Sequence, residues 1–546
     1  MKGHGSTARI RHGAFWAILA GMFAHPASGD DCGAPVFSQQ NQFGARMTLS
    51  FAWGDANRDG RLDLAAGNTS GQGNELYLNA GGGGFTQSNQ FGTGNAFCVV
   101  WVDPDNDGDL DLAVGQGGQN RLYLNNGAAV FTLQNQFGAL STAALAWADY
   151  DRDGDLDGAV GNGIVQAPQQ NALYVNNANG TFTGQSQFGL LRTNTMAWCD
   201  FDGDGDPDLA VGNGGFVTSE QNALYVNNGN GTFTQRAEFG VADTPAMAWG
   251  DMDNDGDFDL CAANWKSGTS YLYVNNGDGT FTPRPAFGAR DTNTLALGDF
   301  DLDGDLDAVV GNGDFTTADQ NYLYVNDGTG NFAEIALFDL GSTDAMAWGD
   351  YDNDGDLDLA VGNEHTPTQN YLFTNGCTAG RYLRVRTIGQ FHARGAGFSN
   401  RDGVGATLRV YAAGHLYDPA FFRALRQVEA KGGFSCQQQP EPHFGLPQDE
   451  SVDLSIRWSG SGGSAISQEL FGVAADQYLT VNETADGNMD CDGVVGSLDV
   501  ARFVAALLDP EGYPDLFAGC NIGSADTNND GRIDGDDIVG FLNALL

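Results

Sequence analysis

The chain has 546 residues, which at roughly 150 residues per domain indicates three or four domains. Its hydrophobic content of 41% suits a sizeable core and excludes a disordered chain. Acidic residues outnumber basic ones by 70 to 25, and the net charge of −45 argues against nucleic acid or an anionic membrane surface as a partner.

The N-terminus predicts an export signal over residues 1–29. Basic residues precede the apolar run Ala14–Ala24, and small residues from Ala27 to Gly29 offer a cleavage site. This run is too short for a comfortable membrane span, and no later window approaches 18 uninterrupted apolar residues. We therefore expect a soluble protein that is secreted to the extracellular space or the cell surface, with no membrane span.

An internal repeat fills residues 30–379. One block, typified by WGDYDNDGDLDLAVGN, returns seven times with a period of 46 to 51 residues. Each period holds four short strand candidates separated by turn sequences such as NNGDG. Four strands per repeat are typical of a propeller blade, so the pattern predicts a mainly β fold that begins with a seven-bladed β-propeller. The alternative is an open β-solenoid, although such coils usually have shorter periods.

The two ends of the repeat array complement each other. The seventh repeat lacks its fourth strand after Tyr371–Phe373, whereas an extra strand candidate, Val36–Ser38, precedes the first repeat. We expect this N-terminal strand to complete the last blade. The alignment brings Cys32 beside Cys377 and predicts a disulfide between them; the alternative is two unpaired thiols.

Each repeat carries a D-x-D-x-D-G-x-x-D loop. Side-chain oxygens stand at positions 1, 3, 5 and 9, and glycine at position 6 permits the sharp turn that folds them around one point. Hard oxygen ligands in a flexible loop suit Ca²⁺ better than Mg²⁺, and the absence of His or Cys from the loops argues against transition metals. The alternative is a set of solvated acidic turns, but crowded carboxylates repel one another and a bound dication relieves that repulsion.

The predicted side-chain ligands fall into seven groups, one per loop. The first group has Asn57 in place of an aspartate, so we expect it to bind calcium more weakly. We expect calcium to stiffen one turn per blade, and the tryptophans before the loops to be buried. The side-chain ligands are Asp55, Asn57, Asp59 and Asp63; Asp103, Asp105, Asp107 and Asp111; Asp149, Asp151, Asp153 and Asp157; Asp200, Asp202, Asp204 and Asp208; Asp251, Asp253, Asp255 and Asp259; Asp299, Asp301, Asp303 and Asp307; and Asp350, Asp352, Asp354 and Asp358.

The FG pairs, the strand pattern and the acidic loops resemble the FG-GAP/VCBS repeats of integrin α-chain propellers and many bacterial secreted proteins. The resemblance covers residues 35–378. It implies up to seven calcium ions, each also bound by a backbone carbonyl at loop position 7. Those carbonyls belong to Arg61, Asp109, Asp155, Asp206, Asp257, Asp305 and Asp356.

Residues 380–483 predict a separate β-rich domain. Pieces such as RYLRVRTIG and NRDGVGATLRVYAAG resemble the ASPIC/UnbV domain, from which no activity follows. The segment from Asn400 through Asp402 to Gly405 fits either another metal loop or a glycine-rich hairpin, and we favour the hairpin. We expect the strand arginines to lie on solvated faces, with binding of anionic ligands as the alternative: Arg384, Arg386, Arg409 and Arg457.

Residues 484–546 contain two loop–helix units that resemble a type I dockerin. The resemblance implies a small α-helical domain with EF-hand-type loops, up to two further calcium ions, and docking onto a cohesin-like partner. Ser497-Leu498 and Gly535-Asp536 differ from the small hydroxylated pairs that often mediate such docking. A bridge between Cys491 and Cys520 stays open. The predicted ligands are Asn488, Asp490, Asp492, Val494 and Asp499 in the first loop, and Asp526, Asn528, Asp530, Arg532, Asp534 and Asp537 in the second.

No catalytic motif is found among the patterns of nucleophilic, zinc-dependent or nucleotide-binding enzymes, so we name no catalytic residue and no organic cofactor. The leading hypothesis is a secreted calcium-binding protein whose propeller binds an extracellular protein or glycan, with a dockerin-like docking tail. The alternative is a secreted polysaccharide-degrading enzyme, a lyase or glycoside hydrolase, attached through its dockerin. The varied segments Gly163–Gln169 and Gly214–Gln221 are the expected place for ligand contacts.

Overall fold

The structure is a computed structural model that describes residues 37–483, except for 89–90, 93, 135–136, 164–166, 216–217, 267, 315–316, 365–368, 378–379, 391–398, 433–435, 447–448 and 461–465. The expected signal peptide and the dockerin-like region, with all of its predicted calcium ligands, lie outside the described residues. The described part is built from strands β1 to β38 and one short 3₁₀ turn, η1 (Pro419–Phe421), which confirms a mainly β fold. Within it, no helix has the length and apolar character needed to cross a membrane.

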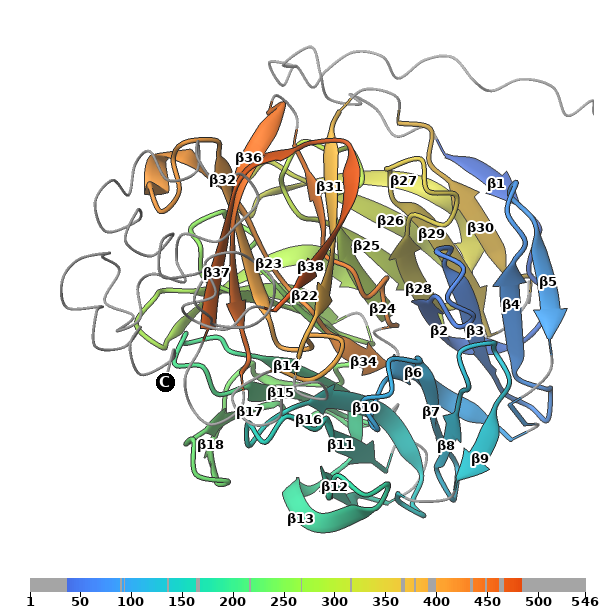
Figure 1. Cartoon of the computed structure of the whole chain (residues 1–546). Helices are drawn as coiled ribbons and strands as arrows, with labels where there is room; N and C mark the ends of the chain where they lie inside the picture. Colours follow the sequence, from blue (N-terminus) through green and yellow to red (C-terminus); the bar gives the residue numbers. More distant parts are fainter. Residues whose placement is uncertain are drawn as a thin grey trace, which may run out of the picture.

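Among the described residues, the repeats form seven four-stranded antiparallel sheets, numbered here in chain order (Figure 1). Sheets 1 to 3 contain β2 (Thr48–Gly54), β3 (Asp63–Asn68), β4 (Glu75–Asn79) and β5 (Phe85–Ser88); β6 (Ala96–Val102), β7 (Asp111–Gln116), β8 (Arg121–Leu124) and β9 (Thr132–Gln134); and β10 (Thr142–Ala148), β11 (Asp157–Asn162), β12 (Gln169–Asn176) and β13 (Phe182–Leu191).

Sheets 4 to 7 follow the same order from the inner to the outer strand. They contain β14 (Thr193–Cys199), β15 (Asp208–Asn213), β17 (Ala223–Asn227) and β18 (Phe233–Arg236); β20 (Ala246–Gly250), β21 (Asp259–Ala263), β22 (Gly268–Asn275) and β23 (Phe281–Arg290); β24 (Thr292–Gly298), β25 (Asp307–Asn312), β26 (Asp319–Asn326) and β27 (Phe332–Gly341); and β28 (Thr343–Gly349), β29 (Asp358–Asn363), β30 (Tyr371–Thr374) and β1 (Ser38–Gln40). A short pair, β16 (Glu220–Gln221) with β19 (Val241–Ala242), lies beside sheet 4.

The N-terminal strand completes the last sheet, as the sequence predicted. β1 pairs antiparallel with β30, with Ser38 opposite Thr374, so the strand begins two residues later than the expected Val36. Among the described residues, Cys98, Cys199, Cys261 and Cys436 are free. The predicted disulfide between Cys377 and Cys32 stays a prediction because Cys32 lies outside the described residues.

Tryptophans on the inner strands join neighbouring sheets. The indole nitrogen of Trp101 donates to Ala52 O across sheets 1 and 2 at 3.1 Å, and Trp198 repeats the contact between sheets 3 and 4. The same contact, from Trp53 to Ala347 O at 3.1 Å, links sheet 1 to sheet 7 and brings the two ends of the array together. These tryptophans are buried, as expected, and the arrangement is typical of a propeller and unlike an open solenoid.

The remaining strands form two sheets that lie over one side of the ring (Figure 1). One has the order β35 (His443–Gly445), β31 (Tyr382–Ile388), β38 (Gln477–Asn482), and the other has β33 (Phe422–Gln427), β32 (Thr407–Ala412), β36 (Ser451–Trp458), β37 (Ile466–Ala474). We call residues 380–483 the C-terminal β domain. Its core is continuous with that of sheets 2 and 3, so the domain packs directly against the ring.

One strand of this domain is an integral part of the ring. β34 (Ala430–Gly432) pairs antiparallel with the inner strand β10, with Leu145 opposite Gly432, which makes sheet 3 five-stranded. We call the described residues of Gln427–His443 the strap; within it, Gln437 and Gln438 contact backbone groups of inner strands. The turn after Asn400 supports the hairpin reading, since its side-chain amide donates to Val404 O at 2.8 Å and accepts from Val404 N at 2.9 Å.

Candidate metal centre

Each acidic loop joins the end of an inner strand to the second strand of its sheet, so all seven open on the same side of the ring. The turn requires left-handed backbone at two places. Glycine at position 6 has a positive φ in every loop, for example +95° at Gly205, and position 4 does too, as at Asn106 with +56°. These two residues reverse the chain, which lets the aspartates of one loop approach one another.

The loop backbone wraps around its own first aspartate. In the fourth loop, Gly205 N donates to Asp200 Oδ2 at 3.0 Å, and Asp206 N donates to Asp204 Oδ1 at 2.9 Å. The equivalent bonds recur in the second loop, where Gly108 N donates to Asp103 Oδ2 at 2.7 Å. The carboxylates are therefore held in place by the fold of the loop itself.

The structure brings the predicted ligands together. In at least five loops, three carboxylates have oxygens that lie within 4.8 Å of one another, which is the spacing of ligands around one cation. The groups are Asp103, Asp105 and Asp107; Asp149, Asp151 and Asp157; Asp200, Asp202 and Asp208; Asp251, Asp253 and Asp255; and Asp299, Asp301 and Asp303.

Several of these carboxylates keep one buried oxygen without a hydrogen-bond partner. At position 9, Asp208 Oδ1 accepts from Asn227 N at 2.7 Å while Oδ2 has none, and Asp111 and Asp157 share this pattern. At position 1, Asp200 Oδ1 and Asp299 Oδ1 are likewise unpartnered. Because a buried oxygen without a partner is costly, these atoms fit a bound cation.

Burial makes the charged loops costly without a cation. It raises the pKa of Asp208 and Asp111 to about 9, and that of Asp63 and Asp251 to about 7; neighbouring loop carboxylates add to each rise. A donor set of carboxylates without sulfur or imidazole suits Ca²⁺. The residues present therefore fit the expected ion, while the position-7 carbonyls stay predicted ligands.

Contacts between successive loops were missed by the sequence reasoning. The position-4 side chain of one loop contacts the position-7 aspartate of the next: Arg58 with Asp109 at 2.6 Å, Asn106 with Asp155 at 2.9 Å, and Arg152 with Asp206 at 2.7 Å. Asn254 and Asp305 repeat it at 2.6 Å. The recurrence of Arg or Asn at position 4 and of Asp at position 7 was the sequence pattern that indicated these contacts between loops.

The expectation that the strand arginines lie on solvated faces is wrong for Arg384, while Arg409 and Arg457 are partly buried. Arg384 is only 3% exposed, and its guanidinium lies 3.1 Å from Glu441 Oε2 and 3.7 Å from Asp350 Oδ2. Arg457 lies 3.2 Å from Asp200 Oδ2. Both reach from the C-terminal β domain to the first aspartate of an acidic loop, so that domain covers the loop side of the ring.

The two varied segments in which ligand contacts are expected, Gly163–Gln169 and Gly214–Gln221, lie at the end of the inner strands opposite the acidic loops. Gly163 N donates to Ser141 O at 2.8 Å, next to the start of β10, and Arg192 Nη1 contacts Glu220 Oε1 at 2.8 Å before β14. Parts of both segments lie outside the described residues. This end, which we call the open face, is far from the acidic loops because each inner strand runs from one to the other.

Family comparisons agree with this architecture. A family described as FG-GAP-like repeat matches residues 55–114, 103–160, 164–211, 200–262, 251–310 and 299–361, which together exceed half of the chain. A second family, ASPIC and UnbV, matches residues 397–488. No curated protein matches the chain.

Solved structures resemble the chain at low similarity. A lectin of Agrocybe aegerita that recognises non-reducing terminal N-acetylglucosamine is 22% identical, with a TM-score of 0.38 over 53% of this chain and 79% of that one. The extracellular domain of the putative hybrid two-component system BT4673 from B. thetaiotaomicron is 12% identical, with a TM-score of 0.42 over 70% and 43%. The rhamnogalacturonan lyase PL11 of Bacillus licheniformis is 13% identical, with a TM-score of 0.37 over 63% and 75%. Likeness of this degree supports no statement about function.

Proposed function

The chain belongs to the FG-GAP-like repeat family, and from this membership we propose that it is a secreted, calcium-stabilised binding protein built on a closed seven-bladed propeller. Its ligand is an extracellular protein or glycan, which it binds without chemical turnover. The dockerin-like tail, argued from sequence alone, attaches the protein to a cohesin-like partner.

The calcium part of the proposal rests on one observation. Buried carboxylate oxygens, such as those of Asp200, Asp208 and Asp299, converge in the loops without a hydrogen-bond partner. Calcium bound there compensates the charge and stiffens one turn per sheet. Its role in this proposal is structural, since the loops lie beneath the C-terminal β domain.

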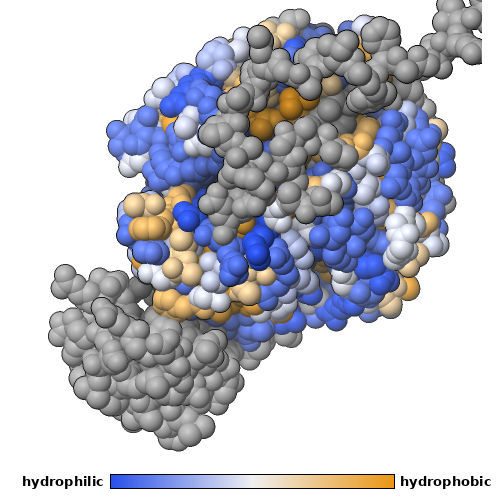
Figure 2. Space-filling model, turned by 90° about the horizontal axis from the view of Figure 1, so that it is seen from above, coloured by the Kyte–Doolittle hydropathy of each residue, from blue (hydrophilic) through white to orange (hydrophobic). Residues whose placement is uncertain are grey.

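The binding part of the proposal concerns the open face. Exposed apolar side chains stand just before the inner strands of sheets 4, 5 and 7: Leu190 is 61% exposed, Val241 64% and Leu340 58%. Figure 2 shows a described surface that is largely hydrophilic and interrupted by separate hydrophobic patches. Apolar side chains that recur at equivalent places around a ring offer a repeated contact for a ligand.

The first test measures calcium itself. Equilibrium dialysis of the purified mature chain should show several bound calcium ions, and chelation should lower its melting temperature. A chain that binds no calcium and melts at the same temperature with and without a chelator contradicts the calcium proposal.

The second test measures the ligand. Arrays of glycans and extracellular proteins are screened in millimolar calcium, and each hit is assayed for degradation products. The double variant Leu190→Ser/Val241→Ser should lose binding, while Val130→Ser, which changes an equally exposed side chain elsewhere, should not. Product release from any glycan contradicts binding without turnover and favours the enzyme alternative.

A further inference from the structure

The acidic loops contact more than their own sheets. We propose that they are the docking surface of the C-terminal β domain, so that calcium binding and the docking of this domain on the ring reinforce each other. The inference rests on the proposed calcium sites and goes beyond them, because it gives the loops an interdomain role.

In two loop carboxylates, one oxygen contacts the C-terminal β domain and the other is left for the cation. Asp299 Oδ2 accepts from Gly304 N at 3.1 Å within its loop and from Gly445 N of β35 at 2.8 Å, which leaves Oδ1 unpartnered and buried. Asp200 Oδ2 likewise accepts from Gly205 N at 3.0 Å and from Arg457 Nη1 at 3.2 Å, and its Oδ1 is unpartnered. One oxygen thus serves docking while the other is available to the cation.

The C-terminal β domain also contacts the backbone of the folded loops. Arg457 Nη1 donates to Gly203 O at 2.8 Å, and Arg409 Nη2 donates to Gly256 O at 3.2 Å. His443 Nε2 lies 3.0 Å from Gly355 O. These carbonyls occupy loop positions 4 and 6, where the backbone turns most sharply, so the contacts require the loop in its closed shape.

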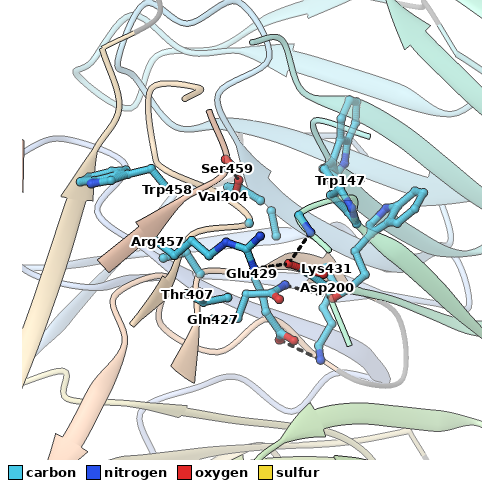
Figure 3. A pocket seen from close by; sticks show the side chains of 17 residues that line it. Trp147, Asp200, Val404, Thr407, Gln427, Glu429, Lys431, Arg457, Trp458 and Ser459 are labelled. Carbon is cyan, nitrogen blue, oxygen red and sulfur yellow. Dashed lines mark hydrogen bonds and ion pairs between the residues drawn. The ribbon is translucent and has the colours of Figure 1, made fainter. Parts of the chain in front are cut away.

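Arg384 fixes the domain to the seventh loop from a buried position. Besides Glu441 and Asp350, it donates to Asn353 Oδ1 at 3.1 Å, and its guanidinium lies 4.7 Å from the ring centre of Tyr478. In Figure 3, Arg457 points toward Asp200 at the corresponding junction above the fourth loop. Arginines from different strands of one domain thus reach different loops.

The strap holds the same domain at the centre of the ring. Gln437 N donates to Phe51 O at 3.0 Å, and its side chain accepts from Trp101 N at 2.7 Å. Gln438 Oε1 accepts from Trp348 N at 2.5 Å, and Gln439 Oε1 accepts from Asp350 N at 2.8 Å. Gln437 and Gln438 contact inner strands rather than loops, so their contacts do not need calcium, and we expect them to keep the domain attached when the loops open.

The direction of the coupling follows from the charges. Without a cation the four carboxylates of a loop repel one another and open it, which removes the backbone positions that Arg409 and Arg457 contact. Calcium therefore favours docking, and by thermodynamic reciprocity the docked domain strengthens calcium binding.

The test follows hydrogen exchange in the full chain, with calcium binding measured separately by equilibrium dialysis. Chelation should speed exchange at least tenfold in β32 and β36, and less in the strand pairs β11–β12 and β25–β26 of the ring. In Arg457→Ala, half-protection of β36 should need at least fivefold more calcium than in the unaltered chain. Arg423→Ala is the matched control, because Arg423 pairs with Asp449 inside the same domain at 2.7 Å.

The outcomes separate the two ideas. If dialysis shows bound calcium but chelation leaves β36 exchange unchanged, or speeds β36 and β11 alike, the coupling is overturned and the calcium proposal stands. If Arg457→Ala and Arg423→Ala behave identically, the docking role of the loops is overturned. If dialysis shows no calcium, both proposals fail together.

Discussion

The buried arginine at the seventh loop gives the sharpest test of how the two domains are joined. Arg384 is 3% exposed and contacts Glu441, whose side chain is 9% exposed, at 3.1 Å. In Arg384→Ala the Glu441 carboxylate stays buried without its counter-charge. Breaking a buried pair by removing one partner costs about 3–5 kcal/mol. We expect a loss of that size in the free energy of unfolding.

The assay is equilibrium denaturation in millimolar calcium, followed by the fluorescence of the tryptophans, with a matched variant beside it. Arg381→Ala removes an arginine of the same domain that is 41% exposed and pairs with Asp476 at 3.0 Å. An exposed pair contributes about 0–1 kcal/mol, so this variant should unfold almost as the unaltered chain does. Arg384→Ala/Glu441→Gln should recover part of the loss, because the Glu441 charge is removed together with its partner, while the buried Asp350 still loses its contact with Arg384. Equal effects of Arg384→Ala and Arg381→Ala would refute the reasoning.

Three further predictions concern the loops. The pKa of Asp208 is raised to about 9 and that of Asp63 to about 7, so the folded chain without calcium holds protons that the unfolded chain releases near pH 4. The melting temperature, measured by calorimetry in a chelator, should therefore fall as pH rises from about 4 to 8, and it should stay nearly level in calcium. A melting temperature that does not change with pH in the chelator would contradict this. Asn57→Asp should strengthen calcium binding by the first loop, and titration of the variant should show one site with tighter affinity; unchanged binding would mean that the neutral oxygen suffices. Arg152→Ala should lower the free energy of unfolding by about 1 kcal/mol through loss of the contact with Asp206, whereas Arg236→Ala, which breaks a more exposed pair with Glu238, should change it less.

The repeat was the part of the fold that the sequence predicted best. A period near 50 residues with alternating strands and fixed turns specifies local pairing, which is why the sheets, the buried tryptophans and the placement of β1 beside β30 were expected. The loops followed from spacing alone, since aspartates at fixed positions converge wherever the glycine turn allows.

The junction between the domains was not predictable in the same way. Arg384 stands on an alternating strand, and alternation says which residues share a face but not what the face packs against. The strap has three consecutive glutamines before Pro440, Gln437 to Gln439, and its sequence is typical of a loop. Its glutamines satisfy the backbone groups of inner strands that are distant in the sequence, and no local pattern records such a partner.

The pairing of β1 with β30 affects the order in which the protein folds. Gln40 Nε2 donates to Thr374 Oγ1 at 2.7 Å across 334 residues of chain, so β1 waits for nearly the whole array to be synthesised before it has a partner. Closing so long a loop costs conformational entropy and slows folding. Until that moment sheet 7 has an unpaired outer edge that is able to accept a strand from another chain. A nascent or unfolded population of this protein is therefore most exposed to aggregation, and to exchange of β1 between copies, at its last step of folding.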